Sequence, residues 1–235
     1  MYKYLLFDAD HTLLDFSRDM EIAFQKMYRA SGLDAALPFS RTVLETYNAC
    51  NERWWRRFER GLCTKPELFR SRFLDFLRET ALPAVDPDVL NTLYFDALGK
   101  TGTAFDGALD LLRSLSALYT IYIVTNGNAS SQHTRLQNSG ILTYTEDYFL
   151  SEDIGAAKPS KQYFDYVLAH IPGAAPEDCI VIGDSLSSDI RGAMNAGMDS
   201  LWYNPHHTEN PEALPVTFEA ESYTDILQFL SEKAV

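Results

Sequence analysis

Residues 2–13 read YKYLLFDADHTL, a short apolar run that ends in two aspartates, Asp8 and Asp10. A run of this length, rich in leucine and aromatic residues, is typical of a buried strand. Open α/β sheets bind ligands just beyond the carboxyl ends of their strands. One aspartate at such a point is equally consistent with a turn, but two acids there predict a strand that carries carboxylates into a functional site.

Further apolar runs of strand length recur along the chain and alternate with segments of helical spacing. The alternation predicts a parallel sheet with helices on both faces, which is an α/β fold. The predicted strands cover residues 2–7, 119–124, 148–151, 179–182 and 200–203, and the predicted helices cover residues 108–117, 131–138, 161–170 and 190–196.

Between the first two predicted strands the pattern changes to helices without an intervening strand. Apolar residues recur on one helical face from Met20 to Tyr28 and again from Val43 to Phe58. Residues 64–67 read TKPE, which has the form of a capping box that opens another helix. We therefore predict a sheet domain made of residues 1–16 and 101–235, with a helical domain inserted at residues 17–100.

Charge is distributed unevenly between these two predicted domains. The 235 residues contain 20 Lys and Arg against 33 Asp and Glu, a formal net charge of −13. Residues 16–100 hold 13 of the bases and 12 of the acids, so the rest of the chain holds 7 and 21. Such an acidic surface argues against sequence-independent binding to a nucleic acid polymer or an anionic membrane. An anionic small-molecule substrate must therefore be held by local groups.

The ends of the chain and its cysteines indicate the expected compartment. The N-terminal apolar run stops at Asp8, so we expect neither a signal peptide nor a membrane span. Cys50, Cys63 and Cys179 form no C-x-x-C pair and leave one thiol over under any pairing scheme. We expect a cytoplasmic protein with reduced thiols, present as a monomer or a homodimer.

Polar residues gather where the other predicted strands and one loop end. Taken alone each is weak, because T-N-G is often only a turn and a single lysine is usually at the surface. Because the carboxyl ends of parallel strands meet at one edge, we expect these groups to lie together. The set comprises Thr125-Asn126-Gly127, Lys158 beside Pro159, and Gly183-Asp184-Ser185 with Asp189.

Several carboxylates at one sheet edge repel one another, by about 4 kcal/mol per pair at 4 Å and an effective dielectric constant near 20. A divalent cation removes that repulsion. Oxygen ligands without a nearby histidine or cysteine favour Mg²⁺, which commonly binds one or two carboxylates together with a phosphate oxygen. Lys158 and Thr125 then offer a positive charge and a hydrogen bond to phosphoryl oxygens.

Four stretches, FDADHTLLDF, IVTNG, AAKPS and VIGDSLSSD, occur in this order. Together they resemble the four motifs of the haloacid dehalogenase (HAD) superfamily. The resemblance implies a Rossmann-like parallel sheet with a helical cap domain inserted after the first motif. It also implies hydrolysis of a phosphate monoester through an aspartyl-phosphate intermediate.

The resemblance also implies roles for individual residues. Asp8 is expected to be the nucleophile that attacks phosphorus, and Asp10 the acid that protonates the leaving oxygen and then the base that activates water. Asp8, Asp10 through its main-chain carbonyl, and Asp184 are expected to hold Mg²⁺.

The remaining motif residues are expected to bind substrate or to support the site. Thr125 and Lys158 are the expected ligands of the phosphoryl group, with Asn126 beside them. Asp189 is expected to support either the metal-bound waters or Lys158.

A finer resemblance concerns DHTLLDF together with GDSLSSDIRGAMNAGMDSLWYNP. This pair is similar to HAD phosphatases that act on nucleoside 5′-monophosphates, especially pyrimidine ones. In the predicted insert, residues 53–57 read RWWRR and are candidates for holding a base or sugar, although tryptophan at helical spacing is more often a core residue.

Three alternatives stay open. A phosphatase of sugar phosphates or a phosphomutase uses the same scaffold, although mutases usually carry glycine where this chain has His11. A 2-haloacid dehalogenase is disfavoured by Asp10, since such enzymes lack the second acid. A non-catalytic binding module is disfavoured by the complete motif set.

Overall fold

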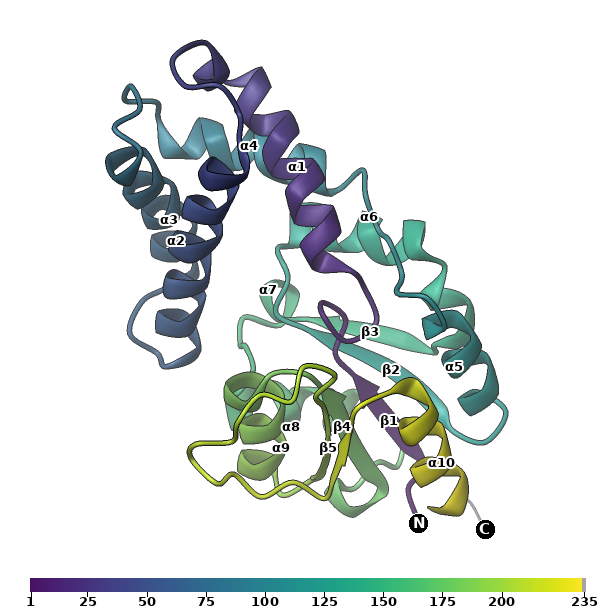
Figure 1. The fold of residues 1–235 in the computed structure, drawn as a ribbon. Coiled ribbons are helices and arrows are strands. Elements are labelled where there is room, and N and C mark those ends of the chain that lie inside the picture. Colours follow the sequence, from purple (N-terminus) through teal and green to yellow (C-terminus); the bar gives the residue numbers. More distant parts are fainter. Residues whose placement is uncertain (234–235) are drawn as a thin grey trace. The chain divides into compact units, whose positions relative to one another are not determined.

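The computed structural model describes residues 1–233. The chain forms two compact units, a sheet unit made of residues 1–16 with residues from 102 onward, and a helical unit made of residues 17–101. Figure 1 follows the chain from the first strand into the helices and back to the sheet.

The sheet unit contains six parallel strands in the order β3-β2-β1-β4-β5-β6. The first strand therefore lies inside the sheet, between two strands that come much later in the sequence (Figure 1). This arrangement confirms the predicted parallel α/β sheet. The strands are β1 Tyr4–Phe7, β2 Thr120–Thr125, β3 Asp147–Leu150, β4 Cys179–Gly183, β5 Asp199–Tyr203 and β6 Phe218–Ala220.

Both faces of the sheet are covered by helices. Neighbouring residues of a strand point to opposite faces, so one strand contributes to two cores. Leu5 and Phe7 of β1 belong to a core with leucines of α5 and α10, whereas Leu6 belongs to a second core with aromatic residues of α8. The helices of this unit are α5 Ala108–Leu115, α6 Ala129–Ser139, α7 Ser151–Ile154, α8 Lys161–His170, α9 Arg191–Ala196 and α10 Tyr223–Lys233.

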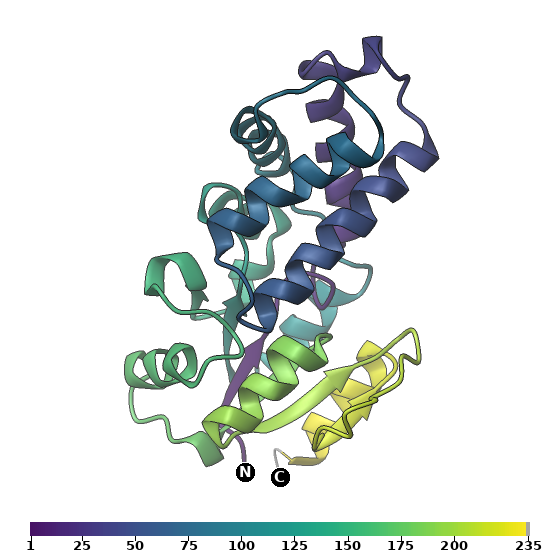
Figure 2. The same ribbon diagram turned by 90° about the vertical axis from the view of Figure 1, so that its left-hand side faces the viewer.

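The helical unit is built from four long helices that Figure 2 shows from a second side. The predicted capping box is present: Thr64 Oγ1 accepts a hydrogen bond from Glu67 N at 3.4 Å, and Glu67 Oε2 accepts one from Thr64 N at 2.7 Å. The helices are α1 Phe16–Ala30, α2 Arg41–Glu59, α3 Lys65–Glu79 and α4 Pro87–Leu98, with a 3₁₀ turn at Leu33–Ala35.

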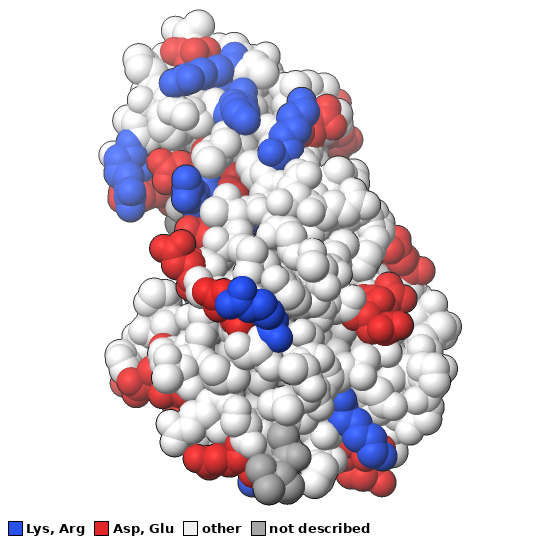
Figure 3. Space-filling view, turned by 90° about the vertical axis from the view of Figure 1, so that its right-hand side faces the viewer, with Lys and Arg blue, Asp and Glu red and all other residues white. Residues whose placement is uncertain are grey.

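Charge follows the division into units. On the face drawn in Figure 3, Lys and Arg side chains are gathered over the helical unit, while Asp and Glu predominate over the sheet unit. Residues 17–101 hold the same 13 bases and 12 acids that were counted for residues 16–100. None of the helices within residues 1–233 combines the length and the apolar character that crossing a lipid bilayer requires.

Arg72 of α3 is a buried cation in the core of the helical unit. Its side chain is among the largest that the core encloses, with 2% of the residue exposed. The guanidinium donates to the side-chain oxygens of Asn51 at 2.9 Å and Asn91 at 3.0 Å. It also lies 5.0 Å from the ring centroid of Phe73 and 4.8 Å from that of Tyr94, which are cation–π distances. Arg72 therefore joins α2, α3 and α4.

Replacing this cation with an apolar side chain of similar length should destabilise the helical unit. Arg72→Met leaves two buried amide oxygens without their donor and removes the cation–π contacts, at a cost of about 2–4 kcal/mol in the free energy of unfolding. Denaturant or thermal unfolding measures this loss. Arg78→Met, on the same helix with a side chain 73% exposed, is the matched control and should cost less than about 0.5 kcal/mol. Equal free energies of unfolding for the two variants would contradict the role of Arg72 in joining the three helices.

Candidate active site

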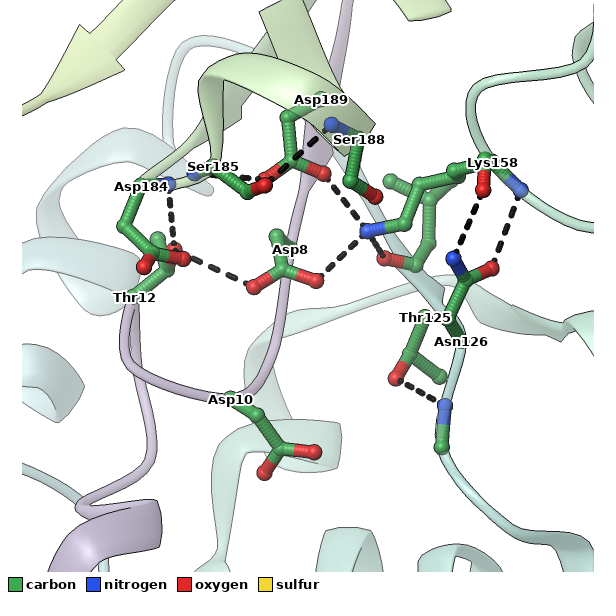
Figure 4. A network of polar contacts seen from close by, with 12 residues as sticks. Asp8, Asp10, Thr12, Thr125, Asn126, Lys158, Asp184, Ser185, Ser188 and Asp189 are labelled. Carbon is green, nitrogen blue, oxygen red and sulfur yellow. Dashed lines mark hydrogen bonds and ion pairs between the residues drawn. The ribbon is translucent and has the colours of Figure 1, made fainter. Parts of the chain in front are cut away.

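The candidate site lies at the carboxyl edge of three adjacent strands. Asp8 follows β1, Thr125 ends β2 and Asp184 follows β4. Lys158 reaches the same edge from the loop before α8 (Figure 4). The parallel register therefore brings together residues that are more than 170 positions apart in the sequence.

Lys158 is the centre of a buried ionic network. Its Nζ donates to Asp8 Oδ1 at 2.6 Å, to Asp189 Oδ1 at 2.7 Å and to the main-chain oxygen of Val124 at 2.9 Å. Burial lowers the pKa of Lys158, but the ion pairs with Asp189 and Asp8 outweigh that effect and hold the pKa above its ordinary value. The ammonium group therefore stays charged beside the Asp8 carboxylate.

Asp8 and Asp184 face each other across Thr12. Its Oγ1 lies 3.2 Å from Asp8 Oδ2 and 3.4 Å from Asp184 Oδ1, and it accepts a hydrogen bond from Asp184 N at 3.1 Å. Burial, opposed by Lys158, raises the pKa of Asp8 from 3.8 to about 7. Burial and the charge on Asp8 likewise raise the pKa of Asp184 well above its ordinary value. In both groups burial is the largest cause, because it disfavours the charged form of the carboxyl group.

The donor set fits a small, hard cation. Carboxylate oxygens of Asp8, Asp184 and Asp189 lie within 4.8 Å of one another. Asp189 is already engaged, because one oxygen contacts Lys158 and the other accepts from Ser185 N at 3.1 Å. This leaves Asp8 and Asp184 as the carboxylates suited to a cation, and an all-oxygen site of this kind suits Mg²⁺.

Asp189 needs a glycine beside it. A Cβ atom built on Gly183 would lie 2.3 Å from Asp189 Oδ2, far inside van der Waals contact. The absence of a side chain at Gly183 therefore lets the short π-helical turn Leu186–Ile190 bring Asp189 against Lys158. The contact of Asp189 with Lys158, one of the two supporting roles expected for this residue, is present in the structure.

Asn126 and Thr125 are neighbours in the sequence, but their side chains contact different parts of the site. The side-chain amide of Asn126 accepts from Lys158 N at 3.0 Å and donates to Lys158 O at 2.8 Å, so it holds the main chain of the lysine (Figure 4). Thr125 Oγ1 accepts from Gly127 N at 3.1 Å and from Gln132 Nε2 at 3.2 Å. Contact of either residue with a phosphoryl group stays a prediction.

The Asp10 carboxylate lies apart from the Lys158 network in Figure 4. Its two oxygens are contacted instead by side chains of α6: Arg135 Nη1 lies 2.7 Å from Oδ1, and Gln132 Nε2 lies 3.2 Å from Oδ2. Neither Gln132 nor Arg135 was predicted from the sequence. The available signal was their spacing of three residues on a helix that begins directly after T-N-G.

The candidate base-binding cluster at residues 53–57 lies on α2 in the helical unit. Arg53 forms ion pairs with Glu79 at 2.8 Å and with Asp75 at 3.3 Å. The indole nitrogen of Trp54 donates to Asp75 at 2.9 Å. These contacts join α2 to α3 and give Arg53 and Trp54 a structural role. Substrate binding by this cluster stays a prediction.

Comparison with known proteins agrees with the motif set. Residues 2–197 match the model of a hydrolase family described as haloacid dehalogenase-like hydrolase. The chain is similar to the pyrimidine 5′-nucleotidase PynA of Streptococcus pneumoniae (35% identity, 98% of this chain, 96% of PynA). It is also similar to the pyrimidine 5′-nucleotidase YjjG of Escherichia coli (32% identity, 97% of this chain, 98% of YjjG).

A solved structure extends the similarity to the whole fold. YfnB of Bacillus subtilis is 37% identical over 98% of this chain and 96% of its own length. Its crystal structure, which has magnesium bound, matches with a TM-score of 0.90 over 97% of this chain and 98% of YfnB.

Proposed function

Because the chain belongs to the haloacid dehalogenase-like hydrolase family, we propose that it is a Mg²⁺-dependent phosphatase of nucleoside 5′-monophosphates, with a preference for pyrimidine nucleotides. The chain is a hydrolase of phosphoric monoesters, as are the nucleotidases that it resembles. The observation that carries the proposal is the pair of acids in one loop, each held by its own buried cation: Asp8 by Lys158 and Asp10 by Arg135.

The first step transfers the phosphoryl group to Asp8. A carboxylate oxygen of Asp8 forms a bond to phosphorus while the bond between phosphorus and the 5′ oxygen breaks. Asp10 gives its proton to the departing 5′ oxygen, which leaves as the hydroxyl of the nucleoside. The product is an aspartyl-phosphate on Asp8.

The second step reverses these roles. Asp10, now a carboxylate, accepts a proton from a water molecule whose oxygen attacks phosphorus. The bond between phosphorus and Asp8 breaks, inorganic phosphate leaves and both acids return to their starting states. Asp10 therefore acts once as an acid and once as a base.

Charge on the phosphoryl oxygens must be balanced throughout. Lys158 supplies a permanent positive charge next to Asp8, and Thr125 supplies a hydroxyl. Mg²⁺ held by Asp8, Asp184 and the main-chain carbonyl of Asp10 would neutralise the remaining negative charge.

The second acid also supports phosphatase chemistry over dehalogenation. A halide leaves as a stable anion and needs no proton, whereas a nucleoside 5′ oxygen does. Asp10 and the two α6 side chains that contact it therefore favour hydrolysis of an ester with a basic leaving group.

Release of phosphate from a panel of substrates tests the proposal. With Mg²⁺ present, kcat/KM should be highest for uridine and cytidine 5′-monophosphates. It should be about tenfold or more lower for glucose 6-phosphate. A tenfold change corresponds to about 1.4 kcal/mol of transition-state binding, the scale of one lost contact. Purine nucleotides should fall between these classes. A higher kcat/KM for the sugar phosphate, or release of chloride from 2-chloropropionate, would exclude the nucleotidase.

A further inference from the structure

We propose that Gln132 and Arg135 are positioning residues that orient the Asp10 carboxyl group for proton transfer. The inference rests on the proposed function, because it requires Asp10 to be the acid and base of the reaction. Neither residue belongs to the four motifs. Both are implicated by the contacts that they make from α6 to Asp10.

The two side chains hold both oxygens of one carboxyl group. Residues three apart on a helix share a face, and α6 turns that face toward Asp10. Arg135 contacts Oδ1 and Gln132 contacts Oδ2, at 2.7 Å and 3.2 Å. Arg135 is fully buried, while the Asp10 side chain is 21% exposed. Asp10 is thus held by two side chains of α6 while its own side chain stays partly exposed.

The positioning residues are themselves fixed. Arg135 Nη1 also donates to Gln132 Oε1 at 2.7 Å, and its guanidinium lies 5.1 Å from the ring centroid of Phe16. Gly127 makes room for this arrangement, because a Cβ atom there would lie 2.6 Å from the Gln132 side chain. A rigid pair of side chains restricts the orientation of the carboxyl group that it contacts.

The two side chains contact Asp10 in different ways. Asp10 Oδ1 accepts from the guanidinium of Arg135, which only donates. Gln132 Nε2 contacts Asp10 Oδ2 and, at 3.2 Å, Thr125 Oγ1 as well. Gln132 therefore links the Asp10 carboxyl group to the hydroxyl expected to hold the phosphoryl group.

Leaving-group dependence distinguishes positioning from general stability. Proton donation contributes little when the leaving group is a weak base and about 10²–10⁴-fold when it is a strong one. In Arg135→Met and Gln132→Met we expect kcat/KM to fall about 10-fold or more with phenyl phosphate and uridine 5′-monophosphate, but less than about threefold with 4-nitrophenyl phosphate. The parameter kcat/KM is used because it covers only the steps up to release of the leaving group.

Two reference variants complete the experiment. Gln137→Met lies on the exposed side of the same helix and should match the wild type with every substrate. Asp10→Asn should show the full leaving-group dependence. Thermal unfolding confirms that each variant is folded, and Gln132→Met decides the question if Arg135→Met does not fold.

The two possible failures are distinguishable. If Asp10→Asn shows the dependence and the folded α6 variants lose activity equally with all three substrates, or lose none, the positioning role is wrong and the proposed function stands. If Asp10→Asn itself shows no dependence on the leaving group, the proposed role of Asp10 fails.

Discussion

Asp8→Asn is expected to lower kcat by at least about 10³-fold, since an amide is a poor nucleophile and the covalent intermediate cannot form. Steady-state release of phosphate from uridine 5′-monophosphate measures the loss. Asp8→Ala, which cannot revert to aspartate by deamidation, should be at least as inactive. Asp165→Asn, an exposed change of the same type on α8, should leave kcat unchanged. Activity above a few per cent of wild type in both Asp8 variants would remove this residue from the nucleophile role.

The same substitution should not destabilise the protein. Burial raises the pKa of Asp8 to about 7, so the folded state binds a proton more readily than the unfolded chain. The carboxylate therefore destabilises the fold progressively as the pH rises from about 4 through about 7. In EDTA above pH 7, the Tm of Asp8→Asn should equal or exceed that of the wild type. Near pH 4 this advantage should disappear.

Removal of divalent metal is expected to abolish activity completely. The carboxylates of Asp8 and Asp184 repel each other and the phosphoryl group, and Lys158 alone neutralises only one charge. Activity lost in EDTA should return with Mg²⁺ or Mn²⁺, whereas Ca²⁺ should inhibit through its larger and looser coordination shell. Full activity after exhaustive chelation would favour the dehalogenase alternative.

Metal binding can be measured without turnover. At one hundred times its Kd, Mg²⁺ should raise the free energy of unfolding by about 2.7 kcal/mol, which thermal unfolding detects. Asp184→Asn should remove both this rise and the activity, while Asp165→Asn should retain both. Stabilisation that survives in Asp184→Asn would place the cation elsewhere.

Much of the sheet was predictable because its inner strands are short and apolar on both faces. The runs at 119–124 and 179–182 match β2 and β4 to within one residue. The strand β6 at Phe218–Ala220 was missed, because three residues containing one glutamate do not form a recognisable run. The helix α10 was missed as well, although its residues Ile226 and Leu230 have helical spacing.

The candidate site was also predictable only in part from the sequence. The sequence placed Asp8, Lys158 and Asp184 together, because parallel strands end at a common edge and the structure follows that rule. The partners of Asp10 could not be inferred so directly. Gln132 and Arg135 reach it from a helix, and which face of α6 points toward the loop depends on how the helix packs. A periodic pattern does not contain that information.

Because β1 lies inside the sheet, both of its partner strands are synthesised after it. Tyr4 pairs with Thr120 in β2 and with Cys179 in β4, so the strand that carries Asp8 leaves the ribosome long before either partner exists. At about 5–20 residues per second, the wait for the first partner lasts on the order of ten seconds. All residues of the helical unit are made within that interval. The apolar strand at the start of the chain must therefore stay unpaired while an entire second unit is synthesised behind it.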